Sequence, residues 1–397
     1  RNGTDRDSSR VERWEAGLAQ NTLLGTEARL VFRNERLVNP TPFRFLDPSV
    51  DARLALELRQ PLLRHFWGRP DVARRRRARA EAAHAQGRLF HARESAAAAA
   101  ARAYLETYFA RGLAAIKAEG VADAKKLLAK YQDKRRYGLV EASDLLQAEA
   151  SVELQETELL LAQSQVEKTQ NALLSALFRA GEPADFPLAA PSGLPPDAAQ
   201  EPSAALARRG DVRAARALSE SSHWSARIET LDTLPDLALT ASYASAGLAT
   251  AYGRAWNDLS TFDHGVKSAG LSLSIALGRR KELLSRKAAR LRAEAAKAEL
   301  EAVENAARRE LRDASVALQL SKKRLAVGRR LAALEEKKFA AEEDNFRRGR
   351  SSTDLLLRFQ QDIRRSQSEL LRAEVDEAMA RLELARARGR LLEAVEL

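Results

Sequence analysis

The sequence predicts a mainly α-helical protein in which long coiled-coil helical hairpins, in tandem duplication, are combined with four β-strands. The duplication is the first observation: the segment from Arg136 to Leu146 has a diverged copy from Arg347 to Leu357, which aligns Gly138 with Gly349 at an offset of 211 residues. Long Ala/Leu-rich stretches flank both copies, as expected for helices. Short runs elsewhere alternate between apolar and polar residues, which is typical of strands with one apolar face.

The composition favours long helices and excludes several kinds of chemistry. The chain has no cysteine and one methionine, and charged residues make up 30% of it. Disulfides, thiol catalysis and cysteine-ligated metals are therefore excluded. The sequence also lacks the roughly 18–20 consecutive apolar residues of a membrane-spanning helix. Membrane β-strands escape that test, because they alternate and need only about 9–11 residues each.

The net charge of +11 and the arginine run at residues 74–77 raise the alternative of a nucleic-acid-binding protein. Acidic residues are interleaved with the basic ones, and neither a zinc-finger spacing nor a glycine-rich phosphate loop is present. We favour a solvated, ion-paired or lumen-facing helix face over an anion site for this run, and we expect no nucleic-acid partner.

Alternating residues predict strands before each helical hairpin. A less regular strand is expected over 27–35, extended upstream through residues 14–24 with a kink at Gly25, and a second strand over 52–59. The second half has matching runs at 237–243 and 271–277. The apolar positions of these runs are the predicted lipid-facing residues: Leu54, Leu56, Leu58, Leu237, Leu239, Leu271, Leu273 and Ile275.

The helices follow these strands. The first is expected from Pro70 to about Arg136, and its return arm from about Glu141 to Phe178. The return arm carries large apolar residues at a heptad spacing and small ones at a second position, as in closely packed coiled coils. A Pro-rich connection and a shorter helix from about Asp211 to Leu231 separate the two copies.

These elements predict five segments. Residues 1–62 hold the first strand pair, 63–178 the first long hairpin with its tip near 137–144, and 179–232 the Pro-rich linker and a helix. Residues 233–278 hold the second strand pair, and a loop that contains several aromatic residues, from Ser245 to Lys267, connects its strands. Residues 279–397 hold the second long hairpin, with its tip near 348–355.

Several motifs give the chain a resemblance to the TolC-type outer-membrane efflux family over nearly its whole length. The matching pieces, which also match in order and spacing, are Leu58-Arg59-Gln60-Pro61-Leu62-Leu63, Tyr137-Gly138-Leu139-Val140, Arg209-Gly210-Asp211-Val212, Leu234-Pro235-Asp236-Leu237 and Phe346-Arg347-Arg348-Gly349-Arg350-Ser351. The sequence departs from the family at Gly210, where proline is usual. A helical segment normally precedes the first strand in this family and is not recognisable here.

The resemblance implies a trimeric α/β barrel duct. Four strands from each protomer would close one β-barrel in the outer membrane, and the helices would form a large periplasmic extension. It also implies a homotrimer that works with a periplasmic adaptor protein and an inner-membrane transporter, in a tripartite efflux pump or a type I secretion system. Such a protein is a transport channel in contact with outer-membrane lipid, not an enzyme, and needs no cofactor and no metal.

The resemblance further implies roles for the two tips. By position, the adaptor-contact residues would be Gly138, Leu139, Val140, Gly349, Arg350 and Ser351. Family members often carry acidic residues six and nine positions after the second glycine, where this chain has Leu355 and Arg358. Asp354 and Asp362 lie nearby, and with Arg358 they are the candidate residues of a periplasmic gate. We hypothesise a mouth that is less cation-selective, with an Arg358 ring favouring anions; the alternative places Arg358 on the outer wall, paired with a carboxylate.

Two other classes of function remain as alternatives. A soluble coiled-coil scaffold or membrane-associated structural protein would explain the long basic helices but not the four alternating strands. An enzyme is the weakest alternative. Of the five histidines only His84 and His91 share a helical face, at a seven-residue spacing, and solvated residues explain them better than a weak metal site.

Overall fold

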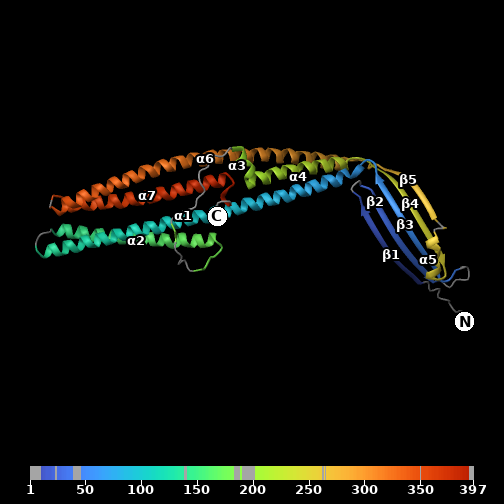
Figure 1. The fold of residues 1–397 in the computed structure, drawn as a ribbon, viewed down its shortest axis with the longest axis horizontal. Coiled ribbons are helices and arrows are strands. Elements are labelled where there is room, and N and C mark those ends of the chain that lie inside the picture. The colour runs from blue at the N-terminus through green and yellow to red at the C-terminus, as the bar shows by residue number, and fades with distance from the viewer. Residues whose placement is uncertain are drawn as a thin grey trace, which may run out of the picture. The chain divides into compact units, whose positions relative to one another are not determined.

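The computed structural model describes residues 10–22, 25–38, 46–137, 141–182, 188–189, 202–261, 263, 265–348 and 350–392. It divides into two compact units. Figure 1 labels the helices and strands from which they are built. The first unit comprises residues 1–83 and 216–299, and the second residues 84–215 and 300–397.

The first unit is built on a five-stranded antiparallel sheet in the order β1-β2-β3-β4-β5. Its strands are β1 (Arg10–Asn21), β2 (Glu27–Val38), β3 (Ser49–Pro61), β4 (Asp236–Ala249) and β5 (Gly265–Ser274). Each strand pairs with its neighbours in sequence order, although β3 and β4 are far apart along the chain. β1 and β5 are the two edges, and every residue of β5 is exposed.

The number of strands corrects the sequence-based expectation of four. The segment upstream of Gly25 does not extend β2 through a kink but turns back and pairs with it as β1. The reason is a tight turn, in which the Gly25 N–H donates to the Thr22 carbonyl over 3.0 Å and Gly25 adopts a φ of +77°. Only glycine adopts this conformation without strain. A Cβ at this position would also lie 2.9 Å from the backbone nitrogen of Gly68.

The long helices confirm the duplication residue for residue. α1 (Arg69–Arg136) and α6 (Arg280–Arg347) each contain 68 residues, and α2 (Ala142–Ala176) and α7 (Thr353–Ala387) each contain 35. Both boundaries of each pair differ by the same 211 residues that separate Gly138 from Gly349. Among the helices in the described part of the chain, none is both long and apolar enough to cross a membrane.

Shorter helices complete the chain: η1 (Phe66–Gly68), α3 (Pro202–Arg208), α4 (Gly210–Asp232) and α5 (Tyr252–Thr261). The sequence predicted α4 within one residue at each end. It did not predict α5, because residues 245–267 were expected to be a loop. That segment instead extends β4 to Ala249 and then forms α5 before β5 begins.

Buried apolar side chains form several separate clusters instead of one core. In the second unit, one cluster near the ends of the hairpins joins α1, α2 and α7 through Leu127, Leu145 and Leu356. Another joins α1 to α7 through Leu105, Val375 and Leu382. In the first unit, a cluster joins the sheet to α5. This distribution suits a wall of helices, in which each helix buries a narrow stripe.

Candidate functional site

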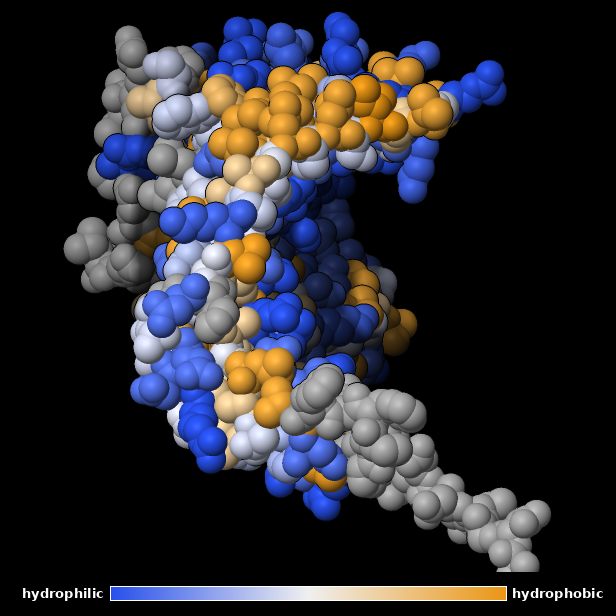
Figure 2. Space-filling model, turned by 90° about the vertical axis from the view of Figure 1, so that its right-hand side faces the viewer, coloured by the Kyte–Doolittle hydropathy of each residue, from blue (hydrophilic) through white to orange (hydrophobic). Residues whose placement is uncertain are grey.

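The sheet of the first unit has one apolar face, which runs across all five strands. The pairing register places Leu18, Leu30, Leu56 and Tyr243 on the same side of four adjacent strands. All the predicted lipid-facing positions that lie within strands share this side: Leu54, Leu56, Leu58, Leu237, Leu239, Leu271 and Leu273. Ile275 lies just beyond the end of β5 and is exposed. We call this side the apolar face. Figure 2, coloured by hydropathy, shows apolar patches among hydrophilic side chains.

The opposite side, the charged face, carries ion pairs between neighbouring strands. Arg13 of β1 pairs with Glu35 of β2 at 2.8 Å, and Arg33 of β2 pairs with Glu15 of β1 at 2.9 Å. Arg59 of β3 contacts Asp236 of β4 at 2.7 Å. These charges are incompatible with a hydrocarbon environment but suit water. The sheet therefore has the two-sided character of a wall between lipid and an aqueous space.

The hairpin tips are only partly described. Gly138, Leu139, Val140 and Gly349 lie outside the described residues. At the second tip, the Arg350 N–H donates to the Asn345 carbonyl over 2.9 Å, and the Ser351 hydroxyl contacts Glu342. Ser352 then caps α7, because its hydroxyl accepts a hydrogen bond from the Leu355 N–H. At the first tip, Glu141 precedes α2 without capping a backbone N–H of the helix, although its carboxylate accepts a hydrogen bond from the Ser143 hydroxyl over 3.5 Å.

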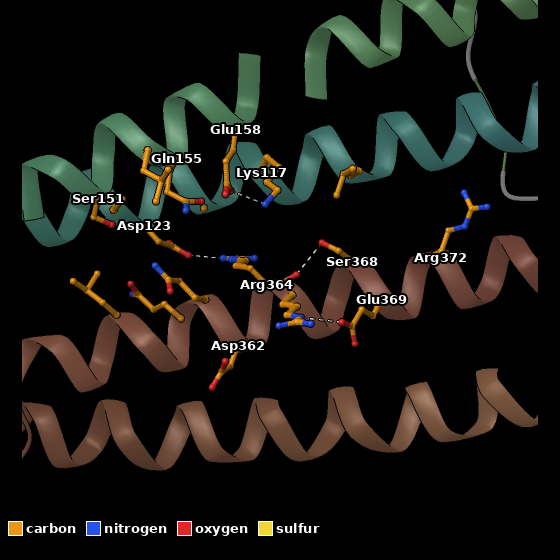
Figure 3. Close-up of a pocket in the computed structure, with 18 of the residues that line it drawn as sticks. Lys117, Asp123, Ser151, Gln155, Glu158, Asp362, Arg364, Ser368, Glu369 and Arg372 are labelled. Atoms are coloured by element: carbon orange, nitrogen blue, oxygen red, sulfur yellow. Dashed lines mark hydrogen bonds and ion pairs between the residues drawn. The ribbon is translucent and has the colours of Figure 1, made fainter. Parts of the chain in front are cut away.

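The structure does not bring the three candidate gate residues, Asp354, Arg358 and Asp362, into one site. Asp354 accepts a hydrogen bond from the Gln147 side chain of α2 over 3.2 Å and so links the two hairpins. Arg358 is exposed, and within the described ranges it forms no ion pair. Asp362 is half-buried and points away from α1 and α2 (Figure 3).

A polar groove that the sequence did not predict lies between α1, α2 and α7 in the second unit (Figure 3). It has a volume of about 670 Å³. Arg364 of α7 reaches across it, donating to Glu119 over 2.6 Å and contacting Asp123, both on α1. Lys117 of α1 pairs with Glu158 of α2 at 2.6 Å. No spacing in the sequence distinguishes Arg364 from the many other arginines of α7.

The polar groove interrupts an otherwise apolar contact between α1 and α7. Leu356 and Leu357 pack against α1 and α2 on the tip side of the groove, and Val375 and Leu382 pack against α1 on the far side. Between them, ion pairs and hydrogen bonds supplement the packing of Leu371 of α7 against Gly112 of α1. The polar contacts cost less to open than apolar ones, because water solvates the separated groups.

A second set of charges, centred on the buried Arg209, lies where α1, α4, α6 and the end of α7 meet. Arg209 donates to Asp211 over 2.7 Å and to Glu310 over 2.6 Å. It also donates to the Ala387 carbonyl over 3.2 Å. Burial alone would lower the pKa of Arg209, but the two carboxylates raise it above its ordinary value. Burial likewise opposes ionisation of Asp211, yet the hydrogen bonds and charge of Arg209 hold its pKa below the ordinary value.

Glu94 of α1 lies beside this set and is only 3% exposed. Burial raises its pKa from 4.5 to about 7, although a backbone hydrogen bond from Leu391 and the charge of Arg209 act in the opposite direction. One of its carboxyl oxygens, Oε1, has no hydrogen-bond partner among the described residues. Glu94 is thus a buried acid that titrates near neutral pH.

Close backbone contact explains two of the glycines and one of the histidines. A Cβ on Gly210 of α4 would lie 2.6 Å from the backbone nitrogen of His91, and a Cβ on Gly87 would lie 2.7 Å from that of Ala214. His84 Nδ1 lies 2.9 Å from the Ala214 carbonyl. In the described residues, no three His, Asp or Glu side chains gather as a metal site would require.

Comparison with known proteins agrees with this arrangement. Residues 202–390 match the family model described as "Outer membrane efflux protein". The match covers slightly less than half of the chain, and this part is similar to the outer membrane efflux protein family. Members of this family are channels of the outer membrane, not enzymes. In a comparison with curated proteins, no sequence matches the chain.

Solved structures extend the likeness of fold to nearly the whole chain. The outer membrane protein VceC from Vibrio cholerae is 18% identical, with a TM-score of 0.68 over 96% of this chain and 87% of that one. The open state of the MtrE channel from Neisseria gonorrhoeae is 17% identical, with a TM-score of 0.69 over 96% of this chain and 81% of that one. The CmeC channel of Campylobacter jejuni is 15% identical, with a TM-score of 0.65 over 97% of this chain and 78% of that one. The predicted fold class is therefore confirmed, with one strand more than expected.

Proposed function

We propose that the chain forms a trimeric duct that exports substrates across the periplasm and the outer membrane. The observation that carries this proposal is the two-sided sheet, with an apolar face for lipid and a charged face for water. Its two edge strands have open edges within one chain, and such edges are satisfied in a membrane only when the sheet closes on itself or on copies of itself. Three copies around one axis give a closed wall.

The duct would act within a tripartite efflux pump or a type I secretion system. Its partners would be a periplasmic adaptor protein and an inner-membrane transporter, which supplies the energy. The hairpin tips are the candidate adaptor contacts, at Gly138, Leu139, Val140, Gly349, Arg350 and Ser351. Support comes from the matching lengths of the two hairpins, which bring equivalent tips to equivalent positions at the ends of α1 and α6.

Membrane extraction and gel migration test the duct against the soluble scaffold. A duct remains in the outer-membrane fraction until detergent is added, and it runs as a trimer that heating converts to monomer. Full solubility of the chain without detergent would favour the scaffold. For the tips, a cysteine at Ser351 should cross-link to the cognate adaptor, while one at the exposed Leu334, within α6, should not.

A further inference from the structure

α5 covers one end of the apolar face. Ala255 and Leu259 of α5 are buried against Val50, Ala52 and Ala249 of the sheet. The backbone of β4 approaches the helix so closely that a Cβ on Gly247 would overlap the Ala255 carbonyl. The Ser245 hydroxyl also donates to the Leu259 carbonyl over 3.1 Å. α5 is therefore a packed part of the sheet unit and not a loose connection.

α5 lies at the end of the sheet away from the long helices. β3 leads into η1 and α1, and β5 leads into α6, whereas α5 connects β4 to β5 at the opposite end of both strands. In the proposed duct the long helices extend into the periplasm. The end that carries α5 then faces the outside of the cell.

An aromatic cluster marks the margin between the covered and the exposed parts of the apolar face. Trp14 of β1 lies 5.1 Å from Phe32 of β2 and 6.1 Å from Trp256 of α5, measured between ring centroids. Tyr252 of α5 lies 6.4 Å from Trp256. The Trp256 indole N–H donates to Asn34 Oδ1 over 3.2 Å. Rings that combine an apolar body with a polar tip are typical of the boundary between lipid tails and headgroups.

The lengths of the strands agree with a boundary at this level. All 14 residues of β4 would extend about 46 Å along the strand, or about 35 Å across a membrane at a tilt of about 40°. That exceeds the apolar band of outer-membrane proteins, which is about 25 Å tall. α5 covers the last part of β4, from Ser245 to Ala249. The uncovered part, Asp236–Ala244, spans about 30 Å along the strand and about 23 Å across the membrane, which fits the band.

The outward side of α5 is polar. Arg254, Asn257 and Ser260 are exposed, while the apolar Ala255 and Leu259 face the sheet. Lys267 of β5 lies on the apolar face above Leu271, with its ammonium 5.8 Å from the Tyr243 ring, where a lysine can extend its charge out of the apolar layer. Lipid tails would be poor neighbours for these groups, whereas headgroups offer them hydrogen bonds and phosphates.

We propose that α5 rests on the lipid surface of the outer leaflet, with its polar side among the headgroups, and fixes the outer limit of the band that contacts lipid tails. The inference depends on the proposed membrane function. The sheet supplies the apolar surface below the aromatic cluster, and α5 replaces lipid above it.

Depth-dependent quenching tests the proposal, since the cysteine-free chain accepts single cysteines without interference. A fluorophore is attached at Asn257→Cys on the outer side of α5, at Leu56→Cys on the part of the apolar face that α5 leaves uncovered, and at Ser242→Cys on the charged face. Each labelled protein is placed in phosphatidylcholine vesicles that carry a nitroxide on either the headgroup or the acyl chain.

We expect the labels at residues 257 and 56, which both face the lipid, to be quenched preferentially by different nitroxides. The label at residue 257 is quenched more by the headgroup nitroxide, the label at 56 more by the acyl-chain nitroxide, and the label at 242 weakly by both. Stronger acyl-chain quenching at 257, or no quenching there while 56 is quenched, would overturn the position of α5 alone. Absence of quenching at 56 would instead contradict the membrane function on which the inference rests.

Discussion

Arg364 of α7 donates a hydrogen bond to the carboxylate of Glu119 on α1 over 2.6 Å, across the polar groove of the second unit. Its second nitrogen contacts Asp123, one helical turn further along α1. One cation thus contacts two carboxylates and ties the return helix of the second hairpin to the first hairpin. Its side chain is only 21% exposed, which protects these contacts from screening.

Arg364→Ala should loosen α7 from α1 and increase the open probability of the channel. The loss of charge-assisted hydrogen bonds at this site costs about 1–3 kcal/mol, and the two carboxylates left behind repel each other. Arg365→Ala is the matched control, because Arg365 is 80% exposed and its ion pair in the described ranges is with Glu369 of its own helix. We expect the control to change stability by less than about 0.5 kcal/mol. Thermal unfolding and single-channel conductance in planar bilayers measure both effects; equal losses in the two variants would contradict a special role for Arg364.

Gly210→Ala should destabilise the second unit. The added methyl group would lie 2.6 Å from the His91 backbone nitrogen and 2.8 Å from the Gly87 carbonyl oxygen, so α4 must shift away from α1. Overpacking of this kind costs about 1–3 kcal/mol. Gly328→Ala in α6 is the control, because its nearest neighbour lies at 3.8 Å, and it should stabilise the helix by about 0.5–1 kcal/mol. Melting temperatures that fall in both variants would show that close contact at Gly210 is not the cause.

The sequence predicted those parts of the fold that depend on repetition and periodicity. The tip glycines set the offset of 211 residues, and both boundaries of all four long helices obey it. The heptad positions Leu145, Val152 and Leu173 are buried, as coiled-coil packing requires. Alternation likewise assigned the leucines of three strands to one face, because the side-chain period of a strand is fixed.

Features that depend on contacts distant in sequence were missed. The sequence of α5 does indicate a helix, because its apolar residues follow a helical spacing: Tyr252, Ala255, Trp256 and Leu259. The segment is so short, however, that the sequence fits a loop equally well. β1 was mistaken for an extension of β2, because a glycine between two alternating runs fits a kink as well as a turn. Arg364 gave no signal, since its partners on α1 lie more than 240 residues away.

Glu94 should make stability depend on pH between about 4.5 and 7. In this window the folded protein keeps a proton on Glu94 that the unfolded chain has released, so the free energy of unfolding falls as the pH rises and levels off above the folded pKa. A shift of this size corresponds to about 3–4 kcal/mol. Glu94→Gln keeps an acceptor for Leu391 and should remove this part of the slope, whereas Glu369→Gln, at an exposed pair, should keep it. Chemical unfolding at pH 5 and pH 8 measures the difference; parallel slopes in wild type and Glu94→Gln would refute it.

Arg358→Ala should shift the ion selectivity of the channel toward cations. Arg358 lies in the second turn of α7, is exposed, and within the described ranges has no carboxylate partner to neutralise it. In a trimer it would contribute three positive charges near the narrow periplasmic mouth, where a charged ring biases which ions enter. Reversal potentials across a planar bilayer in a salt gradient measure this bias. Arg358→Lys should preserve the wild-type value, because it retains the charge, and so should Arg365→Ala, because Arg365 is already paired. A reversal potential that stays the same in Arg358→Ala would place the side chain on the outer wall of the duct, away from the ion path.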